Sequence, residues 1–306
     1  MIGVTVERRT LEDSLAAFDV YLGRVRGVCA GTRHNYVEHV RAFLQTMLVG
    51  AAGTTAEIGP HNVVEFVREL TRRYKAGTVG LAASALRSFF GFLQVEGLCD
   101  DQLVNAVPMV PRRRTGLVRH LDPGRFERLI TSLEASSPRG VRDRAIILCI
   151  ARLGLRASEV VHLRLEDIDW GNATVRVRAR KTGHGALLPL LEEVGAALGD
   201  YLQHARPDTR VREVFVLHQH RIGAPISDSI VGRAVDDALR RAGVAAPGRG
   251  ANLLRHSLAT QLLDHGASLR EIADVFGHRM LATTRIYAAV DVAALREVAL
   301  PWPVTS

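Results

Sequence analysis

The chain has 306 residues, of which 47% are apolar and 24% charged, and these values exclude a disordered chain and a fibre. That length fits two ordinary domains, each able to bury its own core. The net charge of +8 lies entirely in residues 112–306, which carry 29 of the 40 Arg and Lys and 21 of the 32 Asp and Glu, whereas residues 1–111 carry 11 of each.

A basic surplus confined to one part of a chain is typical of a phosphate-binding surface, although a merely soluble basic protein has the same composition. The longest apolar run, 145–151, is far shorter than the roughly 20 residues that cross a bilayer, and the N-terminus lacks the apolar centre of a signal peptide. We therefore expect a cytoplasmic protein without a membrane span. The odd cysteine count and apolar surroundings indicate that Cys29, Cys99 and Cys149 are reduced core residues.

Residues 1–107 alternate helix-like periodicity with short breaks such as residues 50–60. Apolar residues recur at intervals of three and four over 32–48 and 79–97, which predicts packed amphipathic helices in a small bundle. Two prolines and a crowd of basic residues then mark 107–120 as a linker. Such a linker is a solvated connector or, alternatively, a segment that neutralises phosphates.

The pattern after the linker is helical at first and then changes to a period of two. Helices are expected over 121–134, where Asp122 is in cap position before Pro123, and over 141–154. Alternation of valine with arginine over 173–190 predicts a β-hairpin that turns at Thr-Gly-His-Gly. Residues 166–170 are a candidate third strand, so a small antiparallel sheet is expected within a helical domain.

The last hundred residues return to helical periodicity. One helix is predicted to end at Gly266, and the next begins with a capping box, Ser268 and Glu271, and stops at Gly277. His278 therefore lies just beyond a helix end. A further helix after Thr283 or Thr284 places Tyr287 about one turn inside it; taken alone, this segment is a helix-turn-helix with a buried tyrosine.

The basic residues are almost all arginine, and Lys75 and Lys181 are the exceptions. Arginine does not release its proton near neutral pH, whereas lysine does so when its surroundings lower its pKa. Lys181, at the tip of the hairpin, is therefore a candidate proton donor. Residue types suited to holding and cleaving a phosphodiester are found at Arg156, Lys181, Arg255, His278 and Tyr287.

Four segments in order carry a resemblance to a known family: Gly-Leu-Arg-Ala-Ser-Glu around Arg156, Arg-Lys-Thr-Gly around Lys181, Leu-Leu-Arg-His-Ser around Arg255, and the segment from Gly277 to Tyr287. In these features the chain resembles the tyrosine recombinases of the phage integrase class, which include Xer-type and transposon integrases. The resemblance implies a mainly α fold with a small antiparallel sheet. It implies an N-terminal helical, SAM-like core-binding domain over 1–110 and a catalytic domain with a C-terminal tail over 111–306.

The chemistry of these side chains suggests their roles. Tyr287 supplies the oxygen that attacks the scissile phosphate and forms a 3′-phosphotyrosyl link. Arg156 and Arg255 hold the nonbridging oxygens, Lys181 is the general acid for the leaving 5′-oxygen, and His278 donates a hydrogen bond to the phosphate. Bond energy is conserved, so no cofactor is expected. No metal is expected either, because His218 and His220, though spaced as on a strand, have no third ligand of matching pattern.

One position departs from the family pattern. Asn252 stands where the family usually has a histidine, and an amide cannot take up the proton of Tyr287. Water or a neighbouring histidine is the expected substitute. Glu159 is expected to orient its neighbours, and His256 to support Arg255, since consecutive helical residues point in different directions.

The expected function is site-specific recombination of a mobile element. Two alternatives remain: a DNA-binding homologue with impaired chemistry, and an enzyme that only relaxes DNA, as type IB topoisomerases do. The expected partners are double-stranded DNA, further subunits in a homo- or hetero-tetramer, and companion recombinases. Residues 291–306 form a predicted amphipathic helix and a tail with Trp302, which docks either in its own subunit or in a neighbour.

Overall fold

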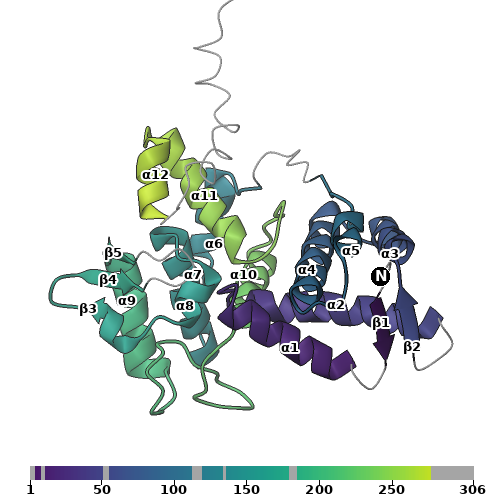
Figure 1. Cartoon of the computed structure of the whole chain (residues 1–306). Coiled ribbons are helices and arrows are strands. Elements are labelled where there is room, and N and C mark those ends of the chain that lie inside the picture. The colour runs from purple at the N-terminus through teal and green to yellow at the C-terminus, as the bar shows by residue number, and fades with distance from the viewer. Residues whose placement is uncertain are drawn as a thin grey trace, which may run out of the picture. The chain divides into compact units, whose positions relative to one another are not determined.

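The computed structural model describes residues 4–7, 11–50, 55–111, 119–133, 136–178 and 185–276. The chain divides into two compact units, 1–115 and 116–306, each with its own hydrophobic core (Figure 1). The predicted mainly helical fold with a small antiparallel sheet is confirmed.

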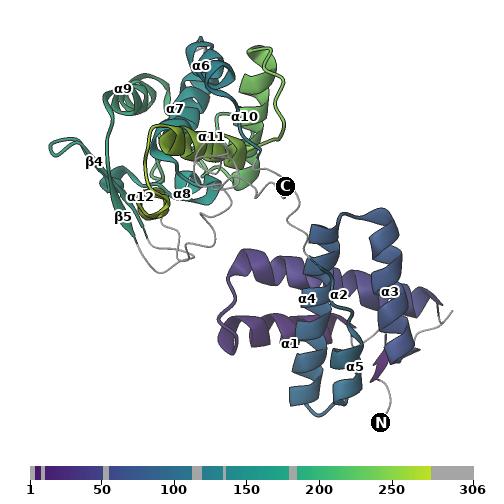
Figure 2. The same ribbon diagram turned by 90° about the horizontal axis from the view of Figure 1, so that it is seen from above.

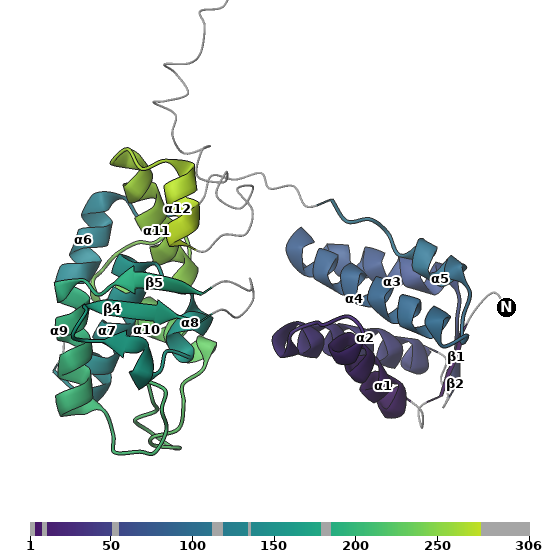
Figure 3. The ribbon, with the colours of Figure 1, turned by 60° about the vertical axis from the view of Figure 1, so that its left-hand side comes forward.

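The N-terminal unit is a helical bundle. Its described elements are β1 (Val4–Glu7), α1 (Leu11–Arg24), α2 (Ala30–Gly50), β2 (Thr55–Ile58), α3 (Pro60–Arg73), α4 (Ala76–Val95) and α5 (Asp101–Ala106). Figure 3 shows α1 and α2 in one layer and α3, α4 and α5 in the other. The buried rings of Phe18, Phe43, Phe89 and Phe90 lie between the layers, and the centroids of Phe18 and Phe89 are 5.2 Å apart. This core makes the unit a packed bundle, as the periodicity predicted.

Helix α4 is the most apolar helix of this bundle. Among the described residues it alone is long and apolar enough to cross a bilayer, and 56% of its most apolar window is buried inside the protein. Ten of its residues, including Leu86 and Phe90, belong to the buried set of the unit. Core helices of globular domains share this composition.

Two features of this unit differ from the sequence expectation. Strands β1 and β2 pair antiparallel, with Val4 opposite Ile58, although residues 50–60 were expected to be only a break between helices. The pairing joins segments far apart in the chain, and four residues are too few to show a clear period. Cys29 is exposed, so it is not a core residue. Cys149 of the C-terminal unit is fully buried, as expected, and burial raises the pKa of its thiol to about 12.

The C-terminal unit surrounds one central helix. Its described helices are α6 (Pro123–Thr131), α7 (Pro138–Leu153), α8 (Ala157–Val161), the 3₁₀ turn η1 (Leu165–Asp167), α9 (Glu192–Asp200), the π-helical turn η2 (Tyr201–Ala205), α10 (Asp228–Arg241), α11 (Ala251–Asp264) and α12 (Leu269–Val275). Helix α7 is buried along most of its length and contacts α8, α9, α10 and α11 (Figure 2). Residues Ala145–Ala151, the apolar run of the sequence, are therefore the centre of this core.

The predicted hairpin and its third strand are present. The sheet has the order β3 (Ile168–Asp169), β4 (Thr174–Val177), β5 (Ala186–Pro189), and both pairings are antiparallel. Val175 is buried opposite Leu188, while Arg176 is exposed, as the alternation predicted. The hairpin's turn, with Lys181, lies outside the described residues.

Predicted caps position the helices that flank the site. Asp122 accepts a hydrogen bond from the backbone N–H of Arg125 at 2.9 Å, before the proline that begins α6. Ser268 and Glu271 form the capping box of α12, which ends at Val275, two residues before Gly277. Despite their strand-like spacing, His218 and His220 do not lie on a strand: both are in an irregular segment, and His220 has a φ of 60°. No described group of three or more His, Cys, Asp or Glu residues is placed to hold a metal.

Candidate active site

Arg156 lies at the junction of α7 and α8. Helix α7 ends at Leu153 and is capped by Gly154, whose φ of 66° is in the left-handed region; the backbone N–H of Leu155 bonds back to the carbonyl of Cys149. Arg156 then caps α8: its backbone N–H donates to Glu159 Oε2 at 2.8 Å, and its Nη1 donates to Glu159 Oε1 at 2.5 Å. One carboxylate thus holds the backbone and the guanidinium of Arg156 together.

Arg255 comes from the middle of α11 and is 5% exposed. Its Nη1 donates to the main-chain carbonyl of Gly154, and its Nη2 donates to the carbonyl of Phe276 at 2.6 Å. The guanidinium carbon lies 4.2 Å from the centroid of the Phe276 ring, within the range of a cation–π interaction. Main-chain oxygens and an aromatic face therefore fix the orientation of this arginine.

The two arginines meet at one oxygen. Nη2 of Arg156 also donates to the Phe276 carbonyl, at 2.9 Å. The oxygen belongs to the residue directly after α12, where helical carbonyls have no partner within the helix. Residues 156 and 255, which the sequence only suggested as companions, are thus brought together on one acceptor.

Asn252 and His256 lie on α11, one turn apart. Asn252 is exposed in the first turn of the helix, and His256 is half-buried beside Arg255. Burial lowers the pKa of His256 below its ordinary value of 6.5, and the positive charge of Arg255 and the nearby His120 lower it further. The neutral, proton-accepting form of His256 is therefore favoured near neutral pH.

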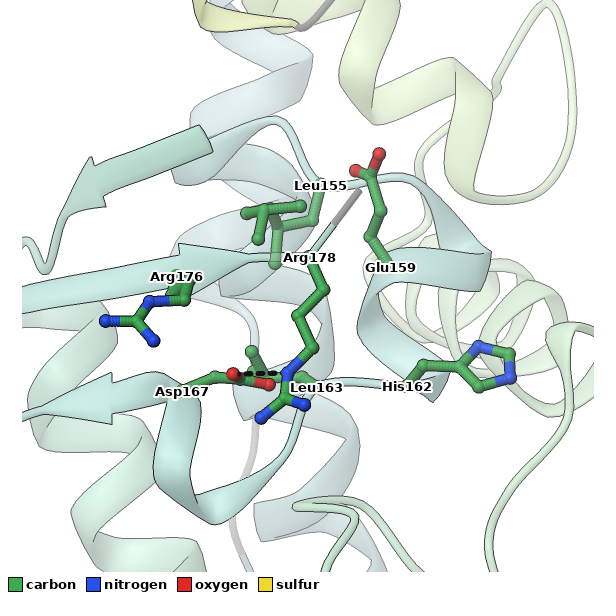
Figure 4. A pocket seen from close by; sticks show the side chains of 8 residues that line it. Leu155, Glu159, His162, Leu163, Asp167, Arg176 and Arg178 are labelled. Atoms are coloured by element: carbon green, nitrogen blue, oxygen red, sulfur yellow. Dashed lines mark hydrogen bonds and ion pairs between the residues drawn. The ribbon is translucent and has the colours of Figure 1, made fainter. Parts of the chain in front are cut away.

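A small pocket adjoins the site on the side of Glu159. Figure 4 shows Glu159 of α8 and His162, directly after that helix, on one side of it and Arg176 and Arg178, from β4 and its continuation, on the other. The buried carboxylate of Asp167 accepts from Arg178 Nε at 2.7 Å and from the backbone N–H of Arg164 at 3.0 Å. The pocket therefore lies between the helix that follows Arg156 and the strand that leads to the hairpin turn.

The remaining predicted site residues lie outside the described residues. They are Lys181, His278, Tyr287 and the tail with Trp302. In the sequence, His278 stands two positions after Phe276, whose carbonyl both arginines contact.

Two residues of this arrangement were missed as site residues. Gly154 was recognisable as a helix-ending glycine, but its carbonyl contact with Arg255 depends on the fold. A side chain on Gly154 is also excluded by space, because its Cβ would lie 2.8 Å from Phe276 Cδ1 and 3.3 Å from Leu258 Cδ2. Phe276 carried no sequence signal beyond that of a core residue at a helix end.

Sequence comparison finds relatives over nearly the whole chain. The phage integrase family matches residues 119–293, and the phage integrase N-terminal SAM-like domain matches residues 15–97. The chain is 38% identical to integrase/recombinase y4rA of Sinorhizobium fredii, covering 96% of this chain and 71% of that protein. It is 33% identical to tyrosine recombinase XerD of Mycobacterium tuberculosis strain H37Rv, covering 95% of this chain and 97% of that protein.

Solved structures with the same fold are also found. The XerH site-specific recombinase bound to a palindromic difH substrate, in a post-cleavage complex, matches with a TM-score of 0.70 and 20% identity, covering 92% of this chain and 83% of that one. The XerA recombinase matches with a TM-score of 0.51 and 27% identity, covering 94% and 96%. The two domains of the chain thus have counterparts of known structure.

Proposed function

The chain belongs to the phage integrase family of tyrosine site-specific recombinases, which cleave and rejoin DNA, and on this premise we propose how its own residues carry out the reaction. The observation that carries the proposal is the convergence of Arg156 and Arg255 on one oxygen. Two guanidinium groups directed at one acceptor form a site suited to the nonbridging oxygens of a phosphodiester.

The arginines stabilise the pentacoordinate transition state, in which the negative charge on the nonbridging oxygens grows. Arg255 is buried and Arg156 is held by Glu159, so both are oriented before DNA arrives. Donors that are already oriented need little reorganisation when the charge develops, and this makes their stabilisation effective.

Tyr287 performs the covalent step. Its phenolic oxygen attacks the scissile phosphorus, the bond from phosphorus to the 5′-oxygen breaks, and Lys181 gives a proton to the leaving oxygen. His278 donates a hydrogen bond to the phosphate. A 5′-hydroxyl from another strand reverses the reaction and releases Tyr287, so the chemistry requires no cofactor.

The proton of Tyr287 passes to water or to a neighbouring histidine, because Asn252 cannot accept it. His256 is the histidine nearest to this position along α11, and its lowered pKa favours the neutral form that accepts protons. His256 also supports the neighbouring Arg255, whether or not it accepts the proton of Tyr287.

The substrate of the proposed enzyme is double-stranded DNA, and the setting is the cytoplasm, where the protein is associated with the nucleoid when bound. The positive surplus of residues 112–306 supports phosphate contacts over this part of the chain. Strand exchange between two duplexes requires several active sites, so we expect a tetramer of this chain, alone or with companion recombinases. A mobile element is the expected source of the DNA sites.

Covalent capture tests the proposal. The wild-type chain and Tyr287→Phe are incubated with a library of nicked random-sequence duplexes, denatured, and the DNA that remains attached to protein is sequenced. Adducts from the wild type alone are expected, and their sequences reveal the preferred site. DNA binding without any wild-type adduct contradicts the nucleophile and supports a homologue with impaired chemistry.

A strand-exchange assay with two duplexes of the captured site separates the remaining alternatives. Joined products from different duplexes are expected of a recombinase. Relaxation of supercoils without joined products identifies an activity of the type IB topoisomerase kind.

A further inference from the structure

Phe276 contacts the arginines of the candidate site through two different groups. Its main-chain carbonyl accepts from both Arg156 and Arg255, and its ring lies against Arg255. We propose that Phe276 is a positioning residue, whose ring holds the guanidinium of Arg255 in the orientation that the transition state requires. This inference rests on the proposed function, because it assigns Phe276 to the arginine that binds the scissile phosphate.

The carbonyl of Phe276 sets the distance between the arginines. It accepts from Nη2 of Arg255 at 2.6 Å and from Nη2 of Arg156 at 2.9 Å. Two like charges repel, and a shared oxygen with a partial negative charge offsets that repulsion. The carbonyl thus keeps two cationic groups close together in the absence of DNA.

The ring supplies a second, independent contact. Its centroid lies 4.2 Å from the guanidinium carbon of Arg255, and the face of an aromatic ring attracts a cation. The ring is itself immobilised: Phe276 is 2% exposed and belongs to a buried cluster with Ala259 of α11 and Ile272 of α12. An immobile ring transmits its own position to the guanidinium.

Gly154 makes this packing possible. Any side chain at residue 154 would meet the ring of Phe276, and the left-handed φ of 66° also favours glycine there. Because the carbonyl of Gly154 accepts from Nη1 of Arg255, the same residue admits the ring and holds the other side of the guanidinium. Within the described part of the chain, two carbonyls and one ring face therefore orient the guanidinium of Arg255.

The test separates the ring's effect on Arg255 from its contribution to folding. Single-turnover formation of the covalent adduct is measured at saturating DNA for the wild type, Phe276→Leu and Phe276→3,4,5-trifluorophenylalanine. Leucine removes the aromatic face, and fluorination weakens the attraction for a cation while nearly preserving the ring's shape. The expected result is a rate about tenfold lower for Phe276→Leu, an intermediate rate for the fluorinated variant, and an unchanged half-saturating DNA concentration.

A matched control is available in the same unit. Phe126 is buried in the main core and also lies beneath an arginine, with the Arg152 guanidinium carbon 5.6 Å from its ring centroid, but it has no part in the site. Phe126→Leu should lower stability without lowering the adduct rate of the folded protein. An equal loss of rate in Phe126→Leu and Phe276→Leu would overturn the proposal.

A second substrate distinguishes failure of this inference from failure of the proposed function. In a methylphosphonate at the scissile position, a methyl group replaces one nonbridging oxygen and the linkage is uncharged. Its cleavage therefore depends less on the arginines. The defects of Arg255→Ala and Phe276→Leu, each relative to wild type, should shrink together on this substrate. If only the Arg255→Ala defect shrinks, Phe276 is merely structural; if neither does, the role of Arg255 is wrong.

Discussion

At the scale of single residues, Arg255 shows how contacts within the fold orient a buried positive charge. Its guanidinium is held by neutral main-chain oxygens and by an aromatic ring, and it shares the Phe276 oxygen with Arg156. Arg156 in turn is held by Glu159 through backbone and side chain. The chemical types of these residues were predictable, but the shared oxygen was not.

Asn252 gives a prediction for the base step. Asn252→His should leave the rate of covalent adduct formation equal or higher, because an imidazole accepts the proton of Tyr287 and an amide does not. Asn252 is exposed, so the larger side chain is expected to fit without repacking the core. Single-turnover adduct formation on the captured DNA site measures the rate, and Asn252→Ala is the control for simple loss of the amide. A marked decrease in Asn252→His would contradict the proposed compensation by water or histidine.

The histidines give a prediction for stability against pH. Burial lowers the pKa of His39, His218 and His256 below 6.5, so below about pH 7 the unfolded chain binds more protons than the folded one. The free energy of unfolding should therefore fall as the pH is lowered from about 7.5 to about 5.5. Urea unfolding at a series of pH values measures this dependence. His256→Gln should show a shallower decrease; a decrease as steep as in wild type would mean that His256 does not contribute.

At the scale of secondary-structure elements, one buried carboxylate connects η1 to the hairpin. Asp167, at the end of η1, accepts from the backbone of Arg164 and from the side chain of Arg178, which follows β4. Its side chain is 1% exposed, whereas that of Arg178 is 47% exposed. Water can solvate the guanidinium of Arg178 but hardly reaches the carboxylate of Asp167, so the carboxylate depends more on the ion pair.

Removing that partner should be costly. Arg178→Met leaves the Asp167 carboxylate buried without its cationic donor, and we expect a loss of about 1–3 kcal/mol in the free energy of unfolding. Arg176→Met is the matched control, because Arg176 lies two residues earlier, on β4, and is exposed; its effect should stay within about 0.5 kcal/mol. Urea unfolding of the full chain compares the two. Equal effects would show that the ion pair contributes nothing beyond a surface arginine.

Element boundaries and pairing differed in how far they were predictable. The capping box of α12 and the hairpin depend on residues close together in the chain, and both were predicted. The β1–β2 pair was not, because its strands have four residues each and lie about fifty residues apart, so that neither shows its partner in its own pattern. Local rules identify elements and hairpins of neighbouring strands, but they do not identify strand pairs that are far apart in the chain.

At the scale of the whole molecule, two separate cores stabilise the chain. The core of the N-terminal unit includes Phe18 and Phe90, and that of the C-terminal unit includes Ile146 and Phe215. The positive surplus belongs to residues 112–306 alone. Because the units divide after Thr115, the arginine run 112–114 falls in the N-terminal unit, so both units share in this surplus.

Independent cores predict independent folding. A fragment of residues 1–111 should unfold cooperatively in urea by circular dichroism, with the helical signal expected of a folded bundle. Phe90→Ala should lower its free energy of unfolding by about 3–5 kcal/mol, because that ring is fully buried. A fragment without a cooperative transition would show that the bundle needs the C-terminal unit to fold.

The sequence by itself determined the family, the order of helices and hairpin, and the identity of most candidate site residues, because residue types, caps and periodicity are local properties. Only the tertiary structure decided that Arg156 and Arg255 share the Phe276 oxygen, that the ring of Phe276 lies against Arg255, and that Cys29 is exposed. Those contacts join residues far apart in the chain or depend on which face of an element is covered. Distances between such residues are set by the packing of α7, α8, α11 and α12, which no single segment encodes.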